Sequence, residues 1–210
     1  MISSVIYSFR ERVPLLFRTV VAASSLACAG SVSAHPHVWI TYESVALMHG
    51  TALEAVKEMW TFSRGFPVAL VGDLSDMPKA GPLGPKHVSI FKQQAFDSLK
   101  GADYFTHVFV NGKPTPFGAP RHFAVSIDDG RIVYSFELPL IDPVDLRLGQ
   151  VQLGIWDETF FVDFQPSPKG AAPVVFNGTA QAACRAKPFE DKNHAIFGGA
   201  VYPLAVELAC

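Results

Sequence analysis

The sequence is poor in charged residues and lacks the short motifs of common enzyme classes. Charged residues make up 17% of the chain and hydrophobic residues 49%, which is not the composition of a disordered or nucleic-acid-binding protein. The formal net charge of −2, about −4 without residues 1–34, gives no attraction to nucleic acid or anionic lipid. No GxSxG, HExxH, P-loop or GxGxxG pattern occurs. We therefore expect a protein that is not an enzyme.

The apolar segment near the amino terminus is too short and too rich in Ser and Ala for a good transmembrane helix. It covers residues 20–30, follows an arginine-flanked start, and leads into Ser31-Val32-Ser33-Ala34. Small residues one and three places before a cut are typical of a secretory signal peptide. We predict that residues 1–34 are a signal peptide, that cleavage follows Ala34, and that the mature periplasmic chain has no membrane span. A rival cut at Cys28 would make a lipoprotein, although Ser25 stands where that signal prefers Leu.

Only three cysteines are present, and the predicted cut removes Cys28. In an oxidising compartment the remaining two, Cys184 and Cys210, are expected to pair. Such a bridge closes a loop of about 26 residues and contributes roughly 3 kcal/mol in the chain-entropy model. A thiolate metal site is the alternative, but the sequence has no CxxC spacing to favour it.

The mature chain, residues 35–210, is predicted to be a single α+β domain with mostly antiparallel β hairpins and one main helix at about 86–100. Residues 53–62 contain helix formers, but we predict a strand because a hairpin with residues 37–48 buries Trp60. Further strands are expected at 104–110, 121–127, 131–138, 150–156 and 159–164. Turn signals at Asn111-Gly112, Asp128-Asp129-Gly130 and Asp157-Glu158 predict three hairpins. The tail to Cys210 is predicted to be irregular.

The predicted mature terminus, His35-Pro36-His37, indicates a metal site. A free α-amine and two imidazoles within three residues suit a borderline transition metal. Pro36 has no N–H to lose, so the square-planar chelate that copper forms with deprotonated backbone amides is blocked. What remains is a bidentate bite by the amine and His35, with His37 available if the strand directs it inward. The alternative interpretation is that both histidines are exposed and bind no metal.

Other residues would have to complete such a site. The candidates are His107, which alternates with Thr106 and Val108 in a strand, His122, which begins a strand, and Asp157, at a strand end beside Trp156. Each has an ordinary alternative: a surface or core histidine, or an aspartate favoured for turn chemistry alone. The remaining histidines, His49, His87 and His194, are expected at the surface.

The opening Ala34-His35-Pro36-His37-Val38-Trp39-Ile40 after a signal peptide resembles domain-of-unknown-function family 1007, whose members are described as periplasmic components of transport systems. Later segments are also similar, namely Trp60-Thr61-Phe62, Ala102-Asp103-Tyr104-Phe105, Phe136-Glu137-Leu138-Pro139-Leu140 and Trp156-Asp157-Glu158-Thr159-Phe160-Phe161. The resemblance implies a metal-handling accessory of nickel/cobalt or zinc transport. Its partner would be a separate inner-membrane transporter, since no permease segment is fused here. Ser63 stands where the family commonly has an acidic residue.

The leading hypothesis is therefore a periplasmic accessory protein that binds a divalent transition metal, zinc or nickel/cobalt. His35 and His37 would be its ligands, with Asp157 and either His107 or His122 completing the site. Two alternatives remain open. One is a copper redox enzyme with an amino-terminal histidine brace, and the other is a structural or interaction module without metal.

Overall fold

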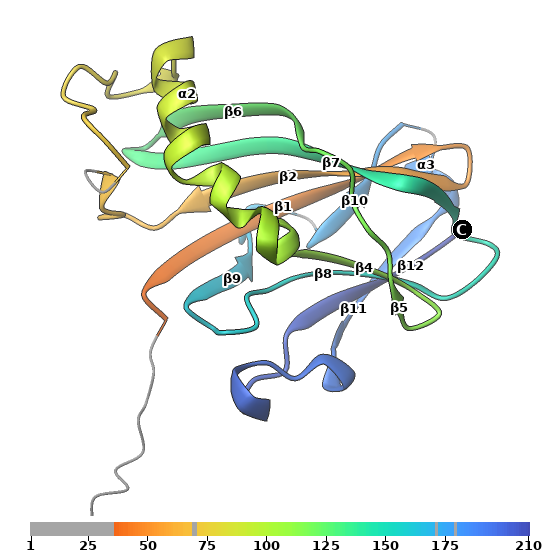
Figure 1. Ribbon diagram of the computed structural model, residues 1–210. Helices are drawn as coiled ribbons and strands as arrows, with labels where there is room; N and C mark the ends of the chain where they lie inside the picture. The colour runs from red at the N-terminus through yellow and green to blue at the C-terminus, as the bar shows by residue number, and fades with distance from the viewer. Residues whose placement is uncertain (1–35, 69–70, 171, 179) are drawn as a thin grey trace, which may run out of the picture. The chain divides into compact units, whose positions relative to one another are not determined.

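Two β-sheets account for most of the regular structure. The computed structural model describes residues 36–68, 71–170, 172–178 and 180–210, so the predicted signal peptide and His35 lie outside the described part. The described residues belong to one compact unit, His35–Cys210. Its strands are mostly antiparallel and its α-helices are short, in keeping with the predicted α+β class (Figure 1). Among these residues, no helix has the length and apolar character needed to cross a membrane.

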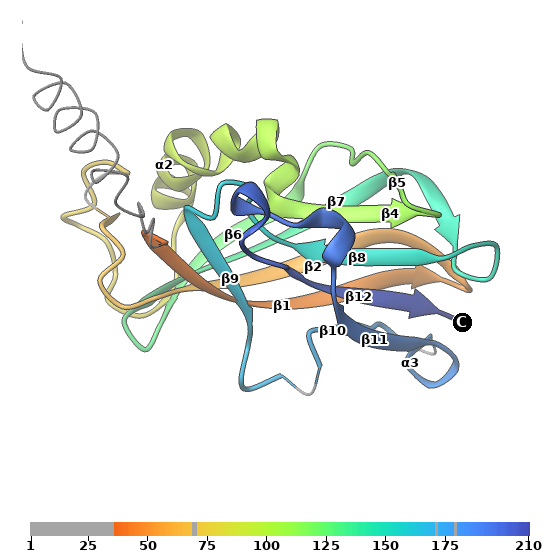
Figure 2. The ribbon, with the colours of Figure 1, turned by 90° about the horizontal axis from the view of Figure 1, so that it is seen from below.

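The larger sheet has seven strands in the order β10-β1-β2-β7-β6-β3, with β9 also paired to β1. Its strands are β1 (Val38–His49), β2 (Ala52–Phe62), β3 (Gly81–Pro82), β6 (Arg121–Asp128), β7 (Arg131–Asp145), β9 (Val162–Pro166) and β10 (Val174–Phe176). Both β9 and β10 run parallel to β1, and Figure 2 shows β9 beside the first half of β1. All other pairs in this sheet are antiparallel.

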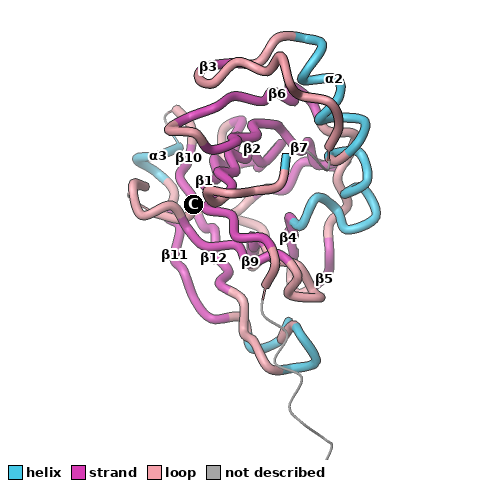
Figure 3. The backbone as a smooth tube through the Cα atoms, turned by 90° about the vertical axis from the view of Figure 1, so that its left-hand side faces the viewer, coloured by secondary structure: helices cyan, strands magenta, loops and turns pink. Residues whose placement is uncertain are grey.

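The smaller sheet has five antiparallel strands in the order β11-β12-β8-β4-β5. They are β4 (Thr106–Val110), β5 (Lys113–Pro114), β8 (Val151–Ile155), β11 (Arg185–Glu190) and β12 (Leu204–Ala209). The tube in Figure 3 shows that β11 and β12 lie together at one side of this sheet. The prediction of an irregular tail was therefore wrong. The alternation in β11 is weak because it is an edge strand with mostly exposed or half-buried side chains.

Turn chemistry predicted two of the three hairpins correctly. Asp129 and Gly130 both have positive φ and form the two-residue loop between β6 and β7. Asn111 and Gly112 do the same between β4 and β5. The strand predicted at 53–62 is also confirmed, as β2, which places Trp60 in the core at 0% exposure.

The third predicted hairpin is wrong, because β8 and β9 belong to different sheets. β8 pairs with β4 and β12, whereas β9 pairs with β1. Between the two strands, the Asp157 carboxylate accepts hydrogen bonds from the backbone N–H groups of Phe161 and Val162. These bonds turn the chain away from β8, so a strand that looks like a hairpin partner in sequence joins the other sheet.

The predicted helix at 86–100 is shorter than expected. The α-helix α2 (Pro85–Gln94) ends where Ala95 leaves helical geometry, and the 3₁₀ segment η2 (Phe96–Phe105) follows. Phe96 and Leu99 are spaced by three residues, which keeps them on one side of a 3₁₀ helix. The apolar pattern therefore continues although the α-helix does not. The other α-helix among the described residues, α3 (Ala180–Ala183), is a single turn.

One face of the larger sheet is covered by two different layers. The half of this face that includes the start of β1 and the end of β2 packs under α2 and η2. The core there is rich in aromatic rings, including Phe91, Phe96 and Tyr134. The half that includes the end of β1 and the start of β2 packs against the smaller sheet through aliphatic side chains such as Val56, Leu153 and Leu208. The other face of the smaller sheet carries a third cluster, around Phe109 and Trp156. That outer face holds the candidate site.

The predicted disulfide is present between Cys184 and Cys210, with 4.0 Å between their Cα atoms. It joins the start of β11 to the end of β12, next to the paired residues Arg185 and Ala209. Replacing both cysteines by serine is expected to lower the free energy of unfolding by about 3 kcal/mol, because the unfolded chain then loses a 26-residue loop constraint. Urea unfolding measures this. Wild-type protein in reductant should match the variant, and equal midpoints for the oxidised wild type and the variant would contradict the prediction.

Candidate functional site

His37, the described member of the predicted terminal pair, stands at the entry to β1. Its backbone N–H donates a hydrogen bond to the Phe161 carbonyl at 2.9 Å. Its ring is exposed and lies 4.9 Å, centroid to centroid, from the exposed ring of Phe161. The backbone is therefore anchored while the imidazole stays accessible. His35 lies outside the described residues.

The carboxylate of Asp157 is hydrogen-bonded within its own loop. Its carboxylate accepts hydrogen bonds from the Thr159 N–H and hydroxyl and from the N–H groups of Phe161 and Val162. These donors, at 2.8–3.1 Å, occupy both oxygens of a side chain in a residue that is only 7% exposed. The structure thus gives Asp157 the role of organising the loop that binds His37 through Phe161.

His122 lies away from these residues, at an irregularity in β6 where the register with β7 shifts. Its φ is +56° and its side chain is 74% exposed, with Nε2 3.8 Å from a Glu137 carboxylate oxygen. His49 is exposed in the β1–β2 turn, as expected. His87 was expected at the surface but is buried on α2, where its Nε2 lies 2.9 Å from Asp76. Among the residues described, the predicted histidines belong to no group of three or more side chains that could hold a metal ion.

His107 does face a cleft, as its alternation in the strand suggested. In β4, Thr106 and Val108 point into the core between the sheets, so His107 and Phe109 point outward. The Nε2 of His107 lies 3.1 Å from the Trp156 carbonyl, which can only accept, so Nε2 carries the proton in this bond. Burial lowers the pKa of this imidazole. The neutral form is thus favoured, and it leaves Nδ1 as a bare acceptor.

Trp156 forms the floor of this cleft because Gly154 leaves room for it. A Cβ at Gly154 would lie 2.0 Å from Cζ3 of the indole, so the ring lies directly against the backbone of β8. Ala205, the partner of Gly154 on β12, is also small and belongs to the same cluster. The indole stacks on the His107 ring at 4.3 Å with an interplanar angle of 18°. Its position therefore depends on one glycine.

His194 is the cleft residue that sequence reasoning missed. It ends the 3₁₀ turn η3 (Lys192–His194), whose amino end is capped by the carboxylate of Asp191. The same carboxylate, 1% exposed, lies 2.7 Å from His194 Nδ1. Because a carboxylate accepts this bond, Nδ1 is the protonated nitrogen and Nε2 is left without a partner among the residues described. An aspartate three positions before a histidine was the available signal, since it is a capping pattern.

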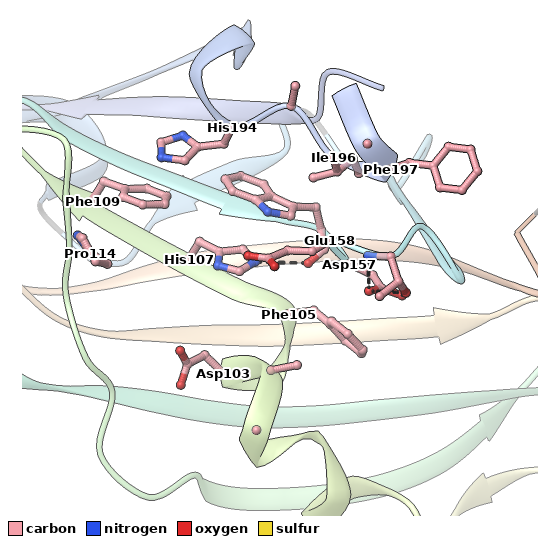
Figure 4. A pocket seen from close by; sticks show the side chains of 16 residues that line it. Asp103, Phe105, His107, Phe109, Pro114, Asp157, Glu158, His194, Ile196 and Phe197 are labelled. Atoms are coloured by element: carbon pink, nitrogen blue, oxygen red, sulfur yellow. Dashed lines mark hydrogen bonds between the residues drawn. The ribbon is translucent and has the colours of Figure 1, made fainter. Parts of the chain in front are cut away.

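The two imidazoles, one from β4 and one from η3, both lie beside Phe109 (Figure 4). The ring of Phe109 is 4.1 Å from that of His194 and 6.4 Å from that of His107. The cleft that they line has a volume of about 720 Å³ and also includes Asp103 and Glu158. The described residues that line it include no lysine or arginine. Within the described ranges, no group of three or more His, Cys, Asp or Glu side chains is arranged to hold a metal ion.

The fold and this cleft define a class: an α+β domain of mostly antiparallel strands with an acidic, aromatic cleft on the outer face of its smaller sheet. A family model described as "Protein of unknown function (DUF1007)" matches residues 20–200, so the chain belongs to that family. The chain is 33% identical over 115 residues to the "Uncharacterized 15.5 kDa protein in trpE 3'region" of Spirochaeta aurantia, covering 54% of this chain and 81% of the relative. An "Uncharacterized protein" of Haemophilus influenzae is 22% identical over 146 residues, 67% of this chain and 66% of the relative.

Proposed function

We propose that the protein is an exported accessory protein that binds a divalent transition metal, zinc or nickel/cobalt, and passes it to a separate inner-membrane transporter. One observation carries the proposal. His37, two residues after a predicted terminal histidine, has an anchored backbone and an exposed imidazole. Anchoring lowers the entropy lost when the ring binds an ion. Exposure leaves room for a partner to take that ion.

The ligands proposed are the imidazoles of His35 and His37 and the α-amine at the predicted cut. The N–H of His37 is already bonded to the Phe161 carbonyl, and Pro36 has none, so backbone amides are not part of the set. Two or three nitrogen ligands leave coordination positions open to water or to a partner's side chain. An incomplete set of this kind suits transfer of a metal better than permanent storage of it.

Replacing His35 and His37 together by alanine is expected to weaken zinc or nickel binding by more than tenfold, because it removes both imidazoles. Isothermal titration of the mature protein with zinc, nickel, cobalt and copper in turn measures this. Since protons compete for imidazole, binding by the wild type should also fall below roughly pH 6.

His122→Ala is the matched control, because its exposed side chain lies on a different part of the larger sheet. It should leave the titration unchanged. Unchanged affinity in the double variant would contradict the proposal. Copper-dependent turnover of peroxide or oxygen would favour a redox enzyme instead.

A further inference from the structure

The cleft on the outer face of the smaller sheet carries uncompensated negative charge. Asp103 and Glu158 line it and are exposed, and in the described part of the chain neither carboxylate has an ion-pair or hydrogen-bond partner. The third acidic residue of the cleft wall, Asp157, is satisfied by bonds within its own loop. Since no lysine or arginine stands among the described lining residues, the cleft attracts cations.

Two imidazole rings in the cleft, held in fixed orientations, can also accept hydrogen bonds from a ligand. His107 donates through Nε2 to the Trp156 carbonyl, and His194 donates through Nδ1 to the Asp191 carboxylate. Each bond fixes the orientation of its ring and leaves the other nitrogen free. In the neutral rings, these nitrogens accept hydrogen bonds from a ligand that carries N–H donors.

The size and lining of the cleft argue for an organic ligand rather than a bare ion. A volume of about 720 Å³ is in the range of sites for small molecules, roughly 300–1,000 Å³. The half-buried ring of Phe105 provides apolar wall. A bare metal ion would need several converging ligands, and across the residues that the structure describes no three acidic, histidine or cysteine side chains converge.

We propose that this cleft is a second binding site, separate from the terminal histidines, for a small organic cation in which an ammonium group is attached to an apolar or aromatic body. The ammonium group lies between Glu158 and Asp103 and donates to a free imidazole nitrogen. The apolar body packs on Phe105.

Isothermal titration with phenethylamine and with 2-phenylethanol tests this, because the two compounds share a body and differ in the charged group. At millimolar concentrations phenethylamine should bind saturably, and 2-phenylethanol should bind at least about tenfold more weakly. Histidine ring signals in NMR spectra should shift for His107 and His194. Equal binding of the two compounds, or no saturable binding of phenethylamine, would overturn the proposal.

Glu158→Gln and Asp103→Asn should each weaken phenethylamine binding by up to about fivefold, as expected for half-solvated ion pairs. Asp142→Asn removes another exposed carboxylate, on β7, that does not line the cleft, and should change nothing. The variant lacking His35 and His37 should bind phenethylamine normally. The proposed metal site and the proposed cleft site are therefore tested independently of each other. Zinc binding that depends on His107 and His194, without phenethylamine binding, would also overturn this one.

Discussion

The stability of the wild-type protein is expected to fall between about pH 5 and pH 8, and replacing Glu58 by glutamine is expected to remove most of that fall. Glu58 lies on β2 in the core, is 0% exposed, and is paired in register with Ser44 on β1. The Ser44 hydroxyl donates to Glu58 Oε2 at 2.8 Å, while Oε1 is buried without a partner in the described structure. Burial raises the pKa of the Glu58 carboxyl to about 8, despite the opposing bond from Ser44.

The direction of the pH effect follows from proton binding. The carboxyl has a pKa near 4.5 when unfolded and about 8 when folded, so between these values the folded state holds more protons. Its contribution to stability is therefore complete below about pH 4.5 and is lost as the pH rises through about 8. The loss for one such group over the whole of this range is about 5 kcal/mol. Glutamine stays neutral at every pH and keeps an acceptor for Ser44.

Urea unfolding from pH 5 to pH 8.5 measures the difference. The wild type should lose several kcal/mol relative to Glu58→Gln over this range, and the variant should be the more stable protein at the alkaline end. Glu54→Gln is the control, because Glu54 is exposed on the same strand. Its curve should run parallel to that of the wild type. If the Glu58→Gln curve also runs parallel, Glu58 is ionised in the folded protein and the argument from burial is wrong.

Features set by neighbouring residues were the ones that sequence reasoning predicted best. The Asp129-Gly130 turn and the outward direction of His107 depend on local φ angles and on strand alternation. The disulfide needed only two cysteines and an expected oxidising compartment. The burial of Glu58 also follows from strand alternation, because Val56, Glu58 and Trp60 alternate along one buried face of β2.

Features set by distant partners could not be predicted in this way. Nothing in residues 159–164 specifies that β9 pairs with β1 rather than with β8, because the choice depends on the Asp157 loop and on the edge that β1 offers. The cleft also depends on segments that are far apart in the chain. His194 reaches it only because the tail forms β11 and β12 and folds η3 back over Phe109, 85 residues earlier in the chain.

Gly154→Ala is expected to destabilise the protein by about 3 kcal/mol, an overpacking cost at the upper end of the usual range. The new methyl group would lie 2.0 Å from Cζ3 and 2.7 Å from Cε3 of Trp156, so the indole must leave its place. Trp156 is only 4% exposed and stacks on His107, so its displacement also opens the cleft floor. Urea unfolding measures the cost, and the His107 ring signals report the loss of stacking. Gly101→Ala is the control, because it lines the same cleft with nothing within 4 Å of its added Cβ.

A double-mutant cycle with Trp156→Ala separates this steric cause from a general intolerance of side chains in β8. Trp156→Ala alone should cost about 3–5 kcal/mol by removing a buried aromatic ring. In that background the added methyl group has no indole to displace, so Gly154→Ala should cost almost nothing, or even stabilise the strand, since alanine restricts the unfolded chain more than glycine does. Additive costs in the double variant would show that Gly154 is required for a reason other than Trp156. A coupling of about 3 kcal/mol, equal to the overpacking cost, would show that the floor of the cleft is set by this one contact between a glycine backbone and an indole ring.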